Sequence, residues 1–368
     1  MPHPSMIWLA CSALFIAIPQ SLVGQQPAEA EAISWHDVTE WGLEGRLLPE
    51  ETRQHWFDRF PAAASNKVTK NVWNLSRDSA GMVFRFTTDS PAIHIHYKLR
   101  KQQLAMPHMP ATGVSGVDLY ARDQTGSWRW VQVIKPTQQE IKQPMINGLA
   151  AGEREYAAYL PLYNGVEFMS IGVDAGASFK GQLPREKPIV FYGTSITHGA
   201  CASRPGMVHT AILGRWLDQP VINLGFSGNG KMDLAVGEFM SQIDAAAYVI
   251  DCLPNMRPAE VREKCEPLVR LLRKARPEIP IILVEDRRFT NDWILPAKHQ
   301  FHSENHAALQ TAFENLTTEG VNGLFYISGD ALYGVDSEGA TDASHANDLG
   351  FMRQAEAFLP ILQQALQP

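Results

Sequence analysis

The second half of the chain alternates short apolar segments with longer amphipathic ones. Its apolar segments are rich in β-branched and aromatic residues and predict buried strands. These segments are Ile189–Tyr192, Val221–Leu224, Ala247–Asp251, Ile281–Val284 and Leu324–Ile327. Helical periodicity marks the segments Val208–Leu217, Pro258–Arg276, His299–Thr318 and Asp348–Leu366. Strands that alternate with helices form a parallel sheet with helices on both faces. The sequence therefore predicts a doubly wound α/β domain over 184–368.

The first half of the chain has a different pattern, in which apolar and polar residues alternate at period two. Such alternation is typical of strands that bury one face. It is clearest in Met82–Phe86, Ile93–Tyr97 and Trp128–Val133. Several short strands separated by turn residues favour an antiparallel β-sandwich, which we expect over 30–181. Two further segments, 155–162 and 165–173, are separated only by Tyr163 and Asn164 and predict a hairpin.

The N-terminal segment Met6–Val23 is strongly apolar and is followed by small and polar residues. It is short for a membrane span, so it predicts a secretory signal peptide over 1–24. We therefore expect an exported protein, periplasmic or secreted, with no stable membrane insertion after cleavage. Removal of the leader leaves Cys201, Cys252 and Cys265, which allow one disulfide at most. The sequence leaves the oligomeric state open.

Charge and motif content argue against several classes of protein. A net charge of -7 disfavours a general nucleic-acid binder. Phosphate-binding motifs are missing at the strand-to-helix turns, so we expect no nucleotide and no other cofactor. Two histidine patterns have a spacing compatible with a metal. His94 and His96 share one face of a strand, and His299, His302 and His306 share one face of a helix. A solvated strand and a partly buried helix stripe explain them more simply, so we expect no metal.

Polar residues that carry chemistry follow the predicted strands. Ser195 follows the first strand, Gly228 lies in a glycine-rich turn after the second, and Asn255 follows the third. Asp342 and His345 come just before the last helix. The carboxyl ends of parallel strands meet at one edge of the sheet, where ligands bind. We therefore expect these side chains to lie close together.

These residue types suit nucleophilic catalysis on an ester. A serine hydroxyl needs a base to remove its proton, and a histidine is suited to that task. Ser195 is thus the candidate nucleophile, His345 the base and Asp342 the acid that orients the imidazole. The backbone N–H groups of Ser195 and Gly228 and the amide of Asn255 are candidate oxyanion donors. The alternative for Ser195 alone is that it caps the following helix.

Other residues near the strand ends have weaker claims. Ser227 lies in a tight Gly-Phe-Ser-Gly turn, but Asn229 replaces the last glycine of the GxSxG nucleophile motif. Asp286 and Arg287 follow the fourth strand, where they are candidate substrate contacts. Cys201 and Cys252 are interpreted as small core residues.

The blocks built on Ser195, Gly228, Asn255 and Asp342-x-x-His345 resemble those of the SGNH, or GDSL-type, hydrolases. The resemblance covers about 184 to the C-terminus and implies a flavodoxin-like fold with the catalytic roles given above. Thr194 stands where that family usually has Asp, and Met256 follows Asn255 where the family usually has Asp.

An upstream motif extends this resemblance to nearly the whole mature chain. Gly116-Val-Asp-Leu-Tyr120 is similar to the GxDLY motif of a domain fused ahead of such hydrolases. It implies a jelly-roll-like β-sandwich as an accessory domain.

The resemblance implies a serine esterase that works through an acyl-enzyme. We expect the substrate to be a small-molecule or polysaccharide ester, with O-acetyl groups on carbohydrate favoured. A lipid or aryl-ester hydrolase remains an alternative. An acyltransferase is another, because water and alcohols compete for the same acyl-enzyme. A glycan-binding protein without activity is disfavoured, since Ser195, Asp342 and His345 are all present.

Overall fold

The computed structural model describes residues 32–367. The predicted signal peptide over 1–24 and the first residues of the predicted sandwich lie outside this part, so that interpretation stays a prediction. Among residues 32–367, no helix combines the length and apolar character needed to cross a bilayer.

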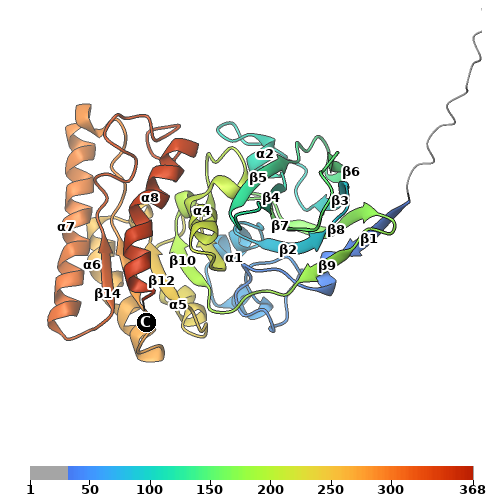
Figure 1. Cartoon of the computed structure of the whole chain (residues 1–368). Helices are drawn as coiled ribbons and strands as arrows, with labels where there is room; N and C mark the ends of the chain where they lie inside the picture. Colours follow the sequence, from blue (N-terminus) through green and yellow to red (C-terminus); the bar gives the residue numbers. More distant parts are fainter. Residues whose placement is uncertain (1–31, 368) are drawn as a thin grey trace, which may run out of the picture. The chain divides into compact units, whose positions relative to one another are not determined.

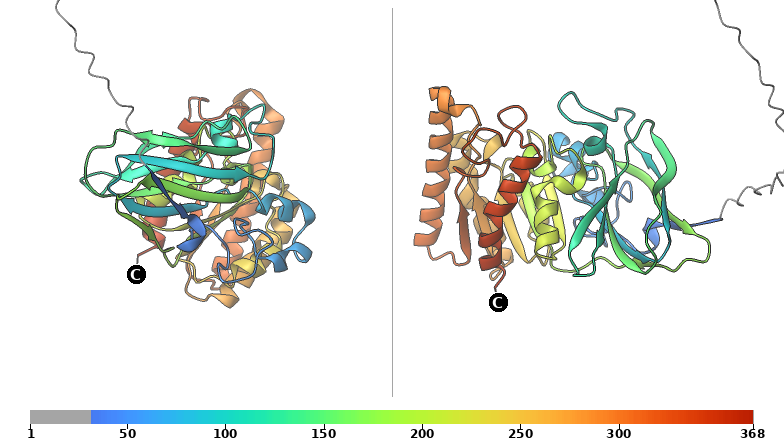
Figure 2. Two further views of the ribbon diagram at one scale, coloured as in Figure 1. Left: turned by 90° about the vertical axis from the view of Figure 1, so that its right-hand side faces the viewer. Right: turned by 45° about the horizontal axis from the view of Figure 1, so that its top comes forward.

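The N-terminal half forms two antiparallel sheets that face each other (Figures 1 and 2). One sheet has the order β1 (Ile33–Asp37), β8 (Val166–Asp174), β3 (Ala92–Leu99) and β6 (Glu140–Asn147). The other has the order β5 (Trp128–Val133), β4 (Asp118–Arg122), β7 (Arg154–Tyr159), β2 (Val83–Thr88) and β9 (Phe179–Gln182). Both sheets contribute to one core, which includes Phe84, Ile95, Leu119 and Met169. The predicted β-sandwich is confirmed.

Strand β3 shows how the sequence pattern produces this packing. Its buried residues Ile93, Ile95 and Tyr97 alternate with His94 and His96, which are partly exposed on the other face. His96 Nε2 lies 2.8 Å from Oε1 of Glu140 on the neighbouring strand. His94 and His96 thus belong to a solvated strand face, as the simpler interpretation held.

The predicted hairpin over 155–173 is wrong. Strand β7 pairs with β2 and β4, whereas β8 pairs with β1 and β3 of the other sheet. The connection between them crosses the sandwich and is buried, as Leu160, Leu162 and Asn164 show. The Asn164 amide bonds the backbone of Lys101 on both its N–H and its carbonyl, which fixes the crossing. Alternation in the sequence marked both strands but did not specify their partners.

The C-terminal half contains a five-stranded parallel sheet with the order β11-β10-β12-β13-β14. The strands are β10 (Ile189–Gly193), β11 (Val221–Gly225), β12 (Ala247–Asp251), β13 (Ile281–Val284) and β14 (Leu324–Ile327). All five predicted strands are present, and the doubly wound fold is confirmed. This strand order is that of flavodoxin-like sheets, in which ligands bind where the order reverses. The reversal lies at β10, between β11 and β12.

Helices cover both faces of this sheet (Figure 1). The longer ones are α4 (His209–Trp216), α5 (Leu234–Met240), α6 (Pro258–Ala275), α7 (Pro296–Thr318) and α8 (Asp348–Ala365). The shorter ones are α1 (Lys70–Ser76), α2 (Ala111–Val114) and α3 (Ser195–His198). In β10, Ile189 and Phe191 join the core beneath α4 and α8, while Val190 and Tyr192 join the core beneath α5, α6 and α7. Helices α1, α2, α3 and α5 were not expected from the sequence.

The two sheet systems are joined through buried contacts. Arg59 is buried and donates to the carbonyls of Asn223 at 2.8 Å and Gly225 at 3.1 Å, at the end of β11. It also donates to the carbonyl of Asp78 at 2.9 Å. Burial lowers the pKa of Arg59 to about 10, against the opposing effects of Asp78 and Tyr163. The chain from Ile33 onward forms one compact unit, and the division expected between 181 and 184 stays a prediction.

Candidate active site

Ser195 lies at the carboxyl end of β10, where the strand order reverses. The strand ends at Gly193, and Thr194 caps the short helix α3 by accepting a hydrogen bond from the Ile196 N–H at 3.3 Å. A Cβ at position 193 would lie 2.0 Å from Oγ1 of Thr197, so the turn requires glycine there. The chain therefore turns sharply from strand to helix and leaves Ser195 at the crevice of the sheet.

A hydrogen-bonded chain of three side chains runs from Ser195. Its Oγ lies 2.8 Å from Nε2 of His345, and Nδ1 of the same ring lies 2.7 Å from Oδ2 of Asp342. These distances are those of a nucleophile, a base and an orienting acid in contact. The structure thus brings together the three residues predicted for catalysis, although they are far apart in the sequence.

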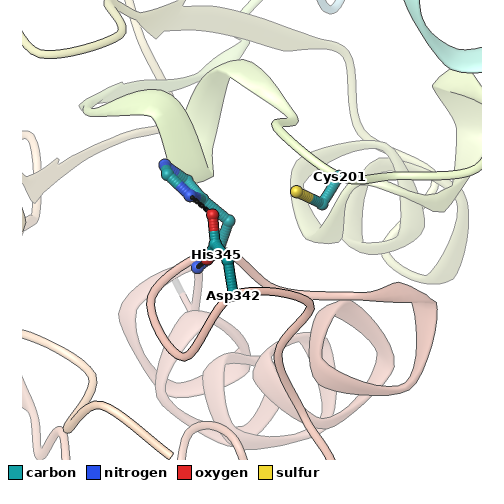
Figure 3. Close-up of side chains that lie close together, drawn as sticks. All are labelled: Cys201, Asp342 and His345. Atoms are coloured by element: carbon teal, nitrogen blue, oxygen red, sulfur yellow. Dashed lines mark hydrogen bonds and ion pairs between the residues drawn. The ribbon is translucent and has the colours of Figure 1, made fainter. Parts of the chain in front are cut away.

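The turn before α8 fixes Asp342 in place. Its Oδ1 accepts hydrogen bonds from the backbone N–H of Ser344 at 3.1 Å and of His345 at 2.8 Å. Burial alone would raise the pKa of Asp342, but the bonds from the His345 backbone and ring, with that from Ser344, lower it. Asp342 is therefore ionised at neutral pH. Figure 3 shows the Asp342–His345 pair beside Cys201.

The three predicted oxyanion donors come from three strand ends. Among residues 32–367, the backbone N–H groups of Ser195 and Gly228 have no hydrogen-bond acceptor. Gly228 has a φ of +70°, in the region that favours glycine. The side-chain amide of Asn255 is satisfied when its oxygen faces the glycine-rich loop. In this orientation the oxygen accepts hydrogen bonds from the N–H of Asn229 at 3.1 Å and of Gly230 at 3.2 Å. That orientation leaves the NH₂ group of Asn255 to donate elsewhere. Their convergence on one oxyanion stays a prediction.

A buried ion pair supports the turn that carries Ser195. Thr197 Oγ1 donates to Oδ2 of Asp251 at 3.1 Å, and Nη2 of Arg287 donates to the same oxygen at 2.8 Å. Arg287 Nη1 bonds the other carboxylate oxygen, and its Nε donates to Gln354 at 2.6 Å. Asp251 is fully buried, and Arg287 is 1% exposed. The pair thus connects α3, β12 and α8 beneath the candidate nucleophile.

The placement of Asp286 and Arg287 does not favour the predicted contact with substrate. Both side chains are buried and bind other residues of the protein. Arg287 is engaged by Asp251 and Gln354, and Asp286 Oδ2 lies 3.0 Å from Nδ1 of His302.

The Arg287 ion pair yields a stability prediction. Arg287→Ala should lower the free energy of unfolding by about 3–5 kcal/mol, because it leaves the buried Asp251 carboxylate without its cation. Chemical denaturation monitored by tryptophan fluorescence measures the effect. The double variant Asp251→Ala/Arg287→Ala should lose less than the sum of the two single variants. A loss below about 1 kcal/mol for Arg287→Ala would show that Asp251 is solvated.

The histidine stripe on α7 has a structural role. His306 Nε2 lies 2.7 Å from the Asp286 carbonyl oxygen and its Nδ1 lies 3.3 Å from Glu285, so His306 attaches α7 to the end of β13. His302 is buried against Asp286, whereas His299 is exposed and bonds Asp292. Within the described residues, the compact group of possible metal ligands is Cys201 with Asp342 and His345, not this stripe.

Three residues near the reacting groups were not predicted from the sequence to belong to the site. Tyr163 donates its hydroxyl to the Ser195 carbonyl at 3.3 Å. The ring of His108 lies 6.0 Å, centre to centre, from that of His345. Cys201 directs its sulfur toward the Asp342–His345 pair (Figure 3). No local motif marks Tyr163 or His108, because each approaches the site only through the packing of the N-terminal half against the sheet.

The three described cysteines are all free and buried. The single disulfide that the sequence allowed is therefore not formed. Burial, the largest effect, raises the pKa of Cys201 to about 11 despite a hydrogen bond with Thr341. The thiol is protonated at neutral pH and is a weak nucleophile there.

Two family models match adjoining parts of the chain. Residues 186–363 match the GDSL-like lipase/acylhydrolase family, and residues 33–179 match the GxDLY domain, the N-terminus of SGNH hydrolase-type esterases. A comparison with curated protein sequences gives no significant match.

Several solved structures resemble this one over most of its length. A GDSL-like lipase from Bacteroides ovatus is 32% identical with a TM-score of 0.85, over 91% of this chain and 98% of that one. The salicylyl-acyltransferase SsfX3 of a tetracycline biosynthetic pathway is 18% identical with a TM-score of 0.71, over 92% and 98%. A family two carbohydrate esterase from Cellvibrio japonicus is 14% identical with a TM-score of 0.58, over 91% and 98%. At these low identities, the last two similarities show a shared fold only.

The Bacteroides ovatus protein shares both sequence and fold with this chain across nearly its whole length. The family models account for the two sheet systems separately. The chain is therefore an ester-hydrolysing enzyme that belongs to the GDSL-like lipase/acylhydrolase family and carries a GxDLY-type N-terminal region.

Proposed function

We propose that this esterase removes short acyl groups, above all acetyl, from carbohydrate through an acyl-enzyme on Ser195. The observation that carries the mechanism is the continuous contact from Ser195 Oγ through His345 to Asp342, with heavy-atom distances of 2.8 and 2.7 Å. We further propose that the protein is exported, on the strength of the apolar segment Met6–Val23.

In the first half of the reaction, Oγ of Ser195 attacks the ester carbonyl carbon as Nε2 of His345 takes its proton. The carbonyl oxygen becomes an oxyanion, which the N–H groups of Ser195 and Gly228 and the amide of Asn255 stabilise. Asp342 stabilises the imidazolium and holds its Nδ1 proton. His345 then gives its proton to the leaving alcohol, and the acyl group stays on Ser195.

In the second half, a water molecule replaces the alcohol. His345 takes a proton from this water as its oxygen attacks the acyl-serine carbonyl, and the same donors stabilise the second oxyanion. The carboxylic acid leaves as Ser195 recovers its proton from His345. The mechanism needs no metal and no cofactor.

Two observations support a carbohydrate ester. The Cellvibrio japonicus carbohydrate esterase shares the fold over 91% of this chain. The cleft beside the Gly228 loop also presents polar side chains, among them Asn71, Lys101 and Asn229. These groups could form hydrogen bonds with the hydroxyls of a sugar.

The proposal is tested with a series of p-nitrophenyl esters and with acetylated xylan. We expect kcat/KM to fall at least tenfold from acetate to octanoate, and we expect acetate release from the xylan, measured enzymatically. A preference for octanoate would contradict the short-chain assignment and favour a lipid ester. Rapid cleavage of p-nitrophenyl acetate without acetate release from any acetylated glycan would contradict the carbohydrate assignment.

A further inference from the structure

A cleft of about 480 Å³ lies beside the loop that carries Gly228. Ser227 and Asn229, which flank Gly228, form part of its wall. The remaining walls come from the N-terminal half: from α1 and Asp78 after it, from the loop after β3, from Val114 of α2 and from Tyr163. Its volume is within the range of about 300–1,000 Å³ that is typical of small-molecule sites. The cleft therefore combines the oxyanion loop with residues of the GxDLY-type region.

Two contacts connect this cleft with the reacting groups. Tyr163, which lines it, donates its hydroxyl to the Ser195 carbonyl at 3.3 Å. Met106, which also lines it, pairs with Met109 through backbone hydrogen bonds of 2.9 and 3.0 Å. This pairing closes a tight turn with His108 at its tip, and the ring of His108 lies 6.0 Å from that of His345. The same loop thus extends from the cleft to the base.

The cleft presents polar groups that are available to a ligand. The side-chain amides of Asn71, Asn74 and Gln103 are exposed and make no hydrogen bond within residues 32–367. Lys101 is held by the buried carboxylate of Asp78 at 2.6 Å and by the Tyr163 carbonyl at 2.9 Å. Amides and an ammonium group donate to hydroxyl oxygens, and the amides also accept from hydroxyl protons.

This chemistry distinguishes between the two parts of an ester. An acyl chain in the cleft would displace water from three amides and an ammonium group without replacing its hydrogen bonds. A polyhydroxylated alcohol would replace them, and the side chains of Leu75, Met106 and Val114 would contact its apolar faces. The cleft therefore fits the alcohol part better than the acyl part.

We propose that this cleft binds the sugar residue that carries the ester, so that the N-terminal half selects the alcohol. The inference rests on the proposed function as a carbohydrate esterase. It assigns to Asn74 and Gln103 the recognition of sugar hydroxyls, a role separate from the chemical step at Ser195.

The test compares two substrates in the double variant Asn74→Leu/Gln103→Leu. Leucine keeps the approximate size of both side chains and removes their hydrogen-bonding groups. We expect the ratio of kcat/KM on acetylated xylo-oligosaccharide to kcat/KM on p-nitrophenyl acetate to fall about tenfold or more, mainly through KM. The matched control is Gln102→Leu, because Gln102 is exposed in the same loop and does not line the cleft. This control should keep the wild-type ratio.

The outcomes separate the inference from the proposed function. If the wild type releases acetate from the oligosaccharide but the double variant keeps the wild-type ratio, the cleft does not bind the sugar and the proposed function stands. An equal fall in the Gln102→Leu control also overturns the inference. If the wild type releases no acetate from any acetylated glycan, the proposed substrate fails and the inference fails with it. Unfolding midpoints of all variants confirm that they are folded.

Discussion

Ser195→Ala should lower kcat on p-nitrophenyl acetate by about 10⁴-fold or more, with only the rate supported by oxyanion binding left. The effect is large because Ser195 Oγ forms the bond to the acyl carbon. Without it, His345 has no proton to take, although the imidazole and Asp342 stay in place. Steady-state assays with purified proteins measure the loss, and the unfolding midpoint of the variant should stay close to that of the wild type.

A fluorophosphonate probe gives an independent readout of the same residue. It should label the wild type at Ser195 and should not label Ser195→Ala. The matched variant is Ser227→Ala, since Ser227 was the rival serine in the sequence. Labelling should survive in it, because the serine that bonds His345 is Ser195. Labelling of Ser195→Ala, or its loss in Ser227→Ala, would show that Ser195 is not the nucleophile.

The parallel sheet was predictable from the sequence because its strands are buried on both faces. In β10 and β12 every residue is buried, so each strand reads as an uninterrupted apolar run with clear ends. The polar residues that follow these runs must lie at one edge of the sheet. This reasoning identified Ser195 and Asn255, which come within four residues of the ends of their strands. Asp342 and His345 required the additional pattern of an Asp-x-x-His turn before a helix.

The rest of the site depends on long-range packing that no local pattern encodes. Asp286 and Arg287 also follow a strand, and only the contacts with His302 and Asp251 show that they are directed inward. Tyr163 belongs to a segment that resembled a hairpin turn. Because its chain crosses between the two sandwich sheets instead, the ring of Tyr163 lies against His198, with ring centres 4.1 Å apart. A crossing of this kind follows from the pairing of strands, which alternation does not determine.

Asp342→Asn should lower kcat by about 10³–10⁴-fold at neutral pH, with the fold intact. The amide has no charge to stabilise the imidazolium, and its NH₂ group can face Nδ1 of His345 and favour the wrong tautomer. The control is Asp336→Asn. Asp336 bonds Arg353 at 2.7 Å, which lowers its pKa to about 2, and it makes no hydrogen bond with His345. Its variant should keep kcat within about twofold of the wild type.

The pH dependence of stability gives the same assignment a second readout. Burial acts to raise the pKa of Asp342 in the folded chain. The hydrogen bonds from His345 act in the opposite direction, and the pKa is lowered overall. The ionised carboxylate therefore stabilises the fold above the unfolded pKa of about 3.9, and this contribution is lost as the pH falls through the folded pKa. The difference in unfolding midpoint between the wild type and Asp342→Asn should be largest near pH 7 and should shrink below about pH 4. A constant difference, or a kcat close to that of the wild type, would mean that Asp342 does not orient His345. Because Asp336 should show the same loss of stabilisation in acid without a loss of kcat, the pair of variants separates the charge that stabilises the turn from the charge that serves the reaction.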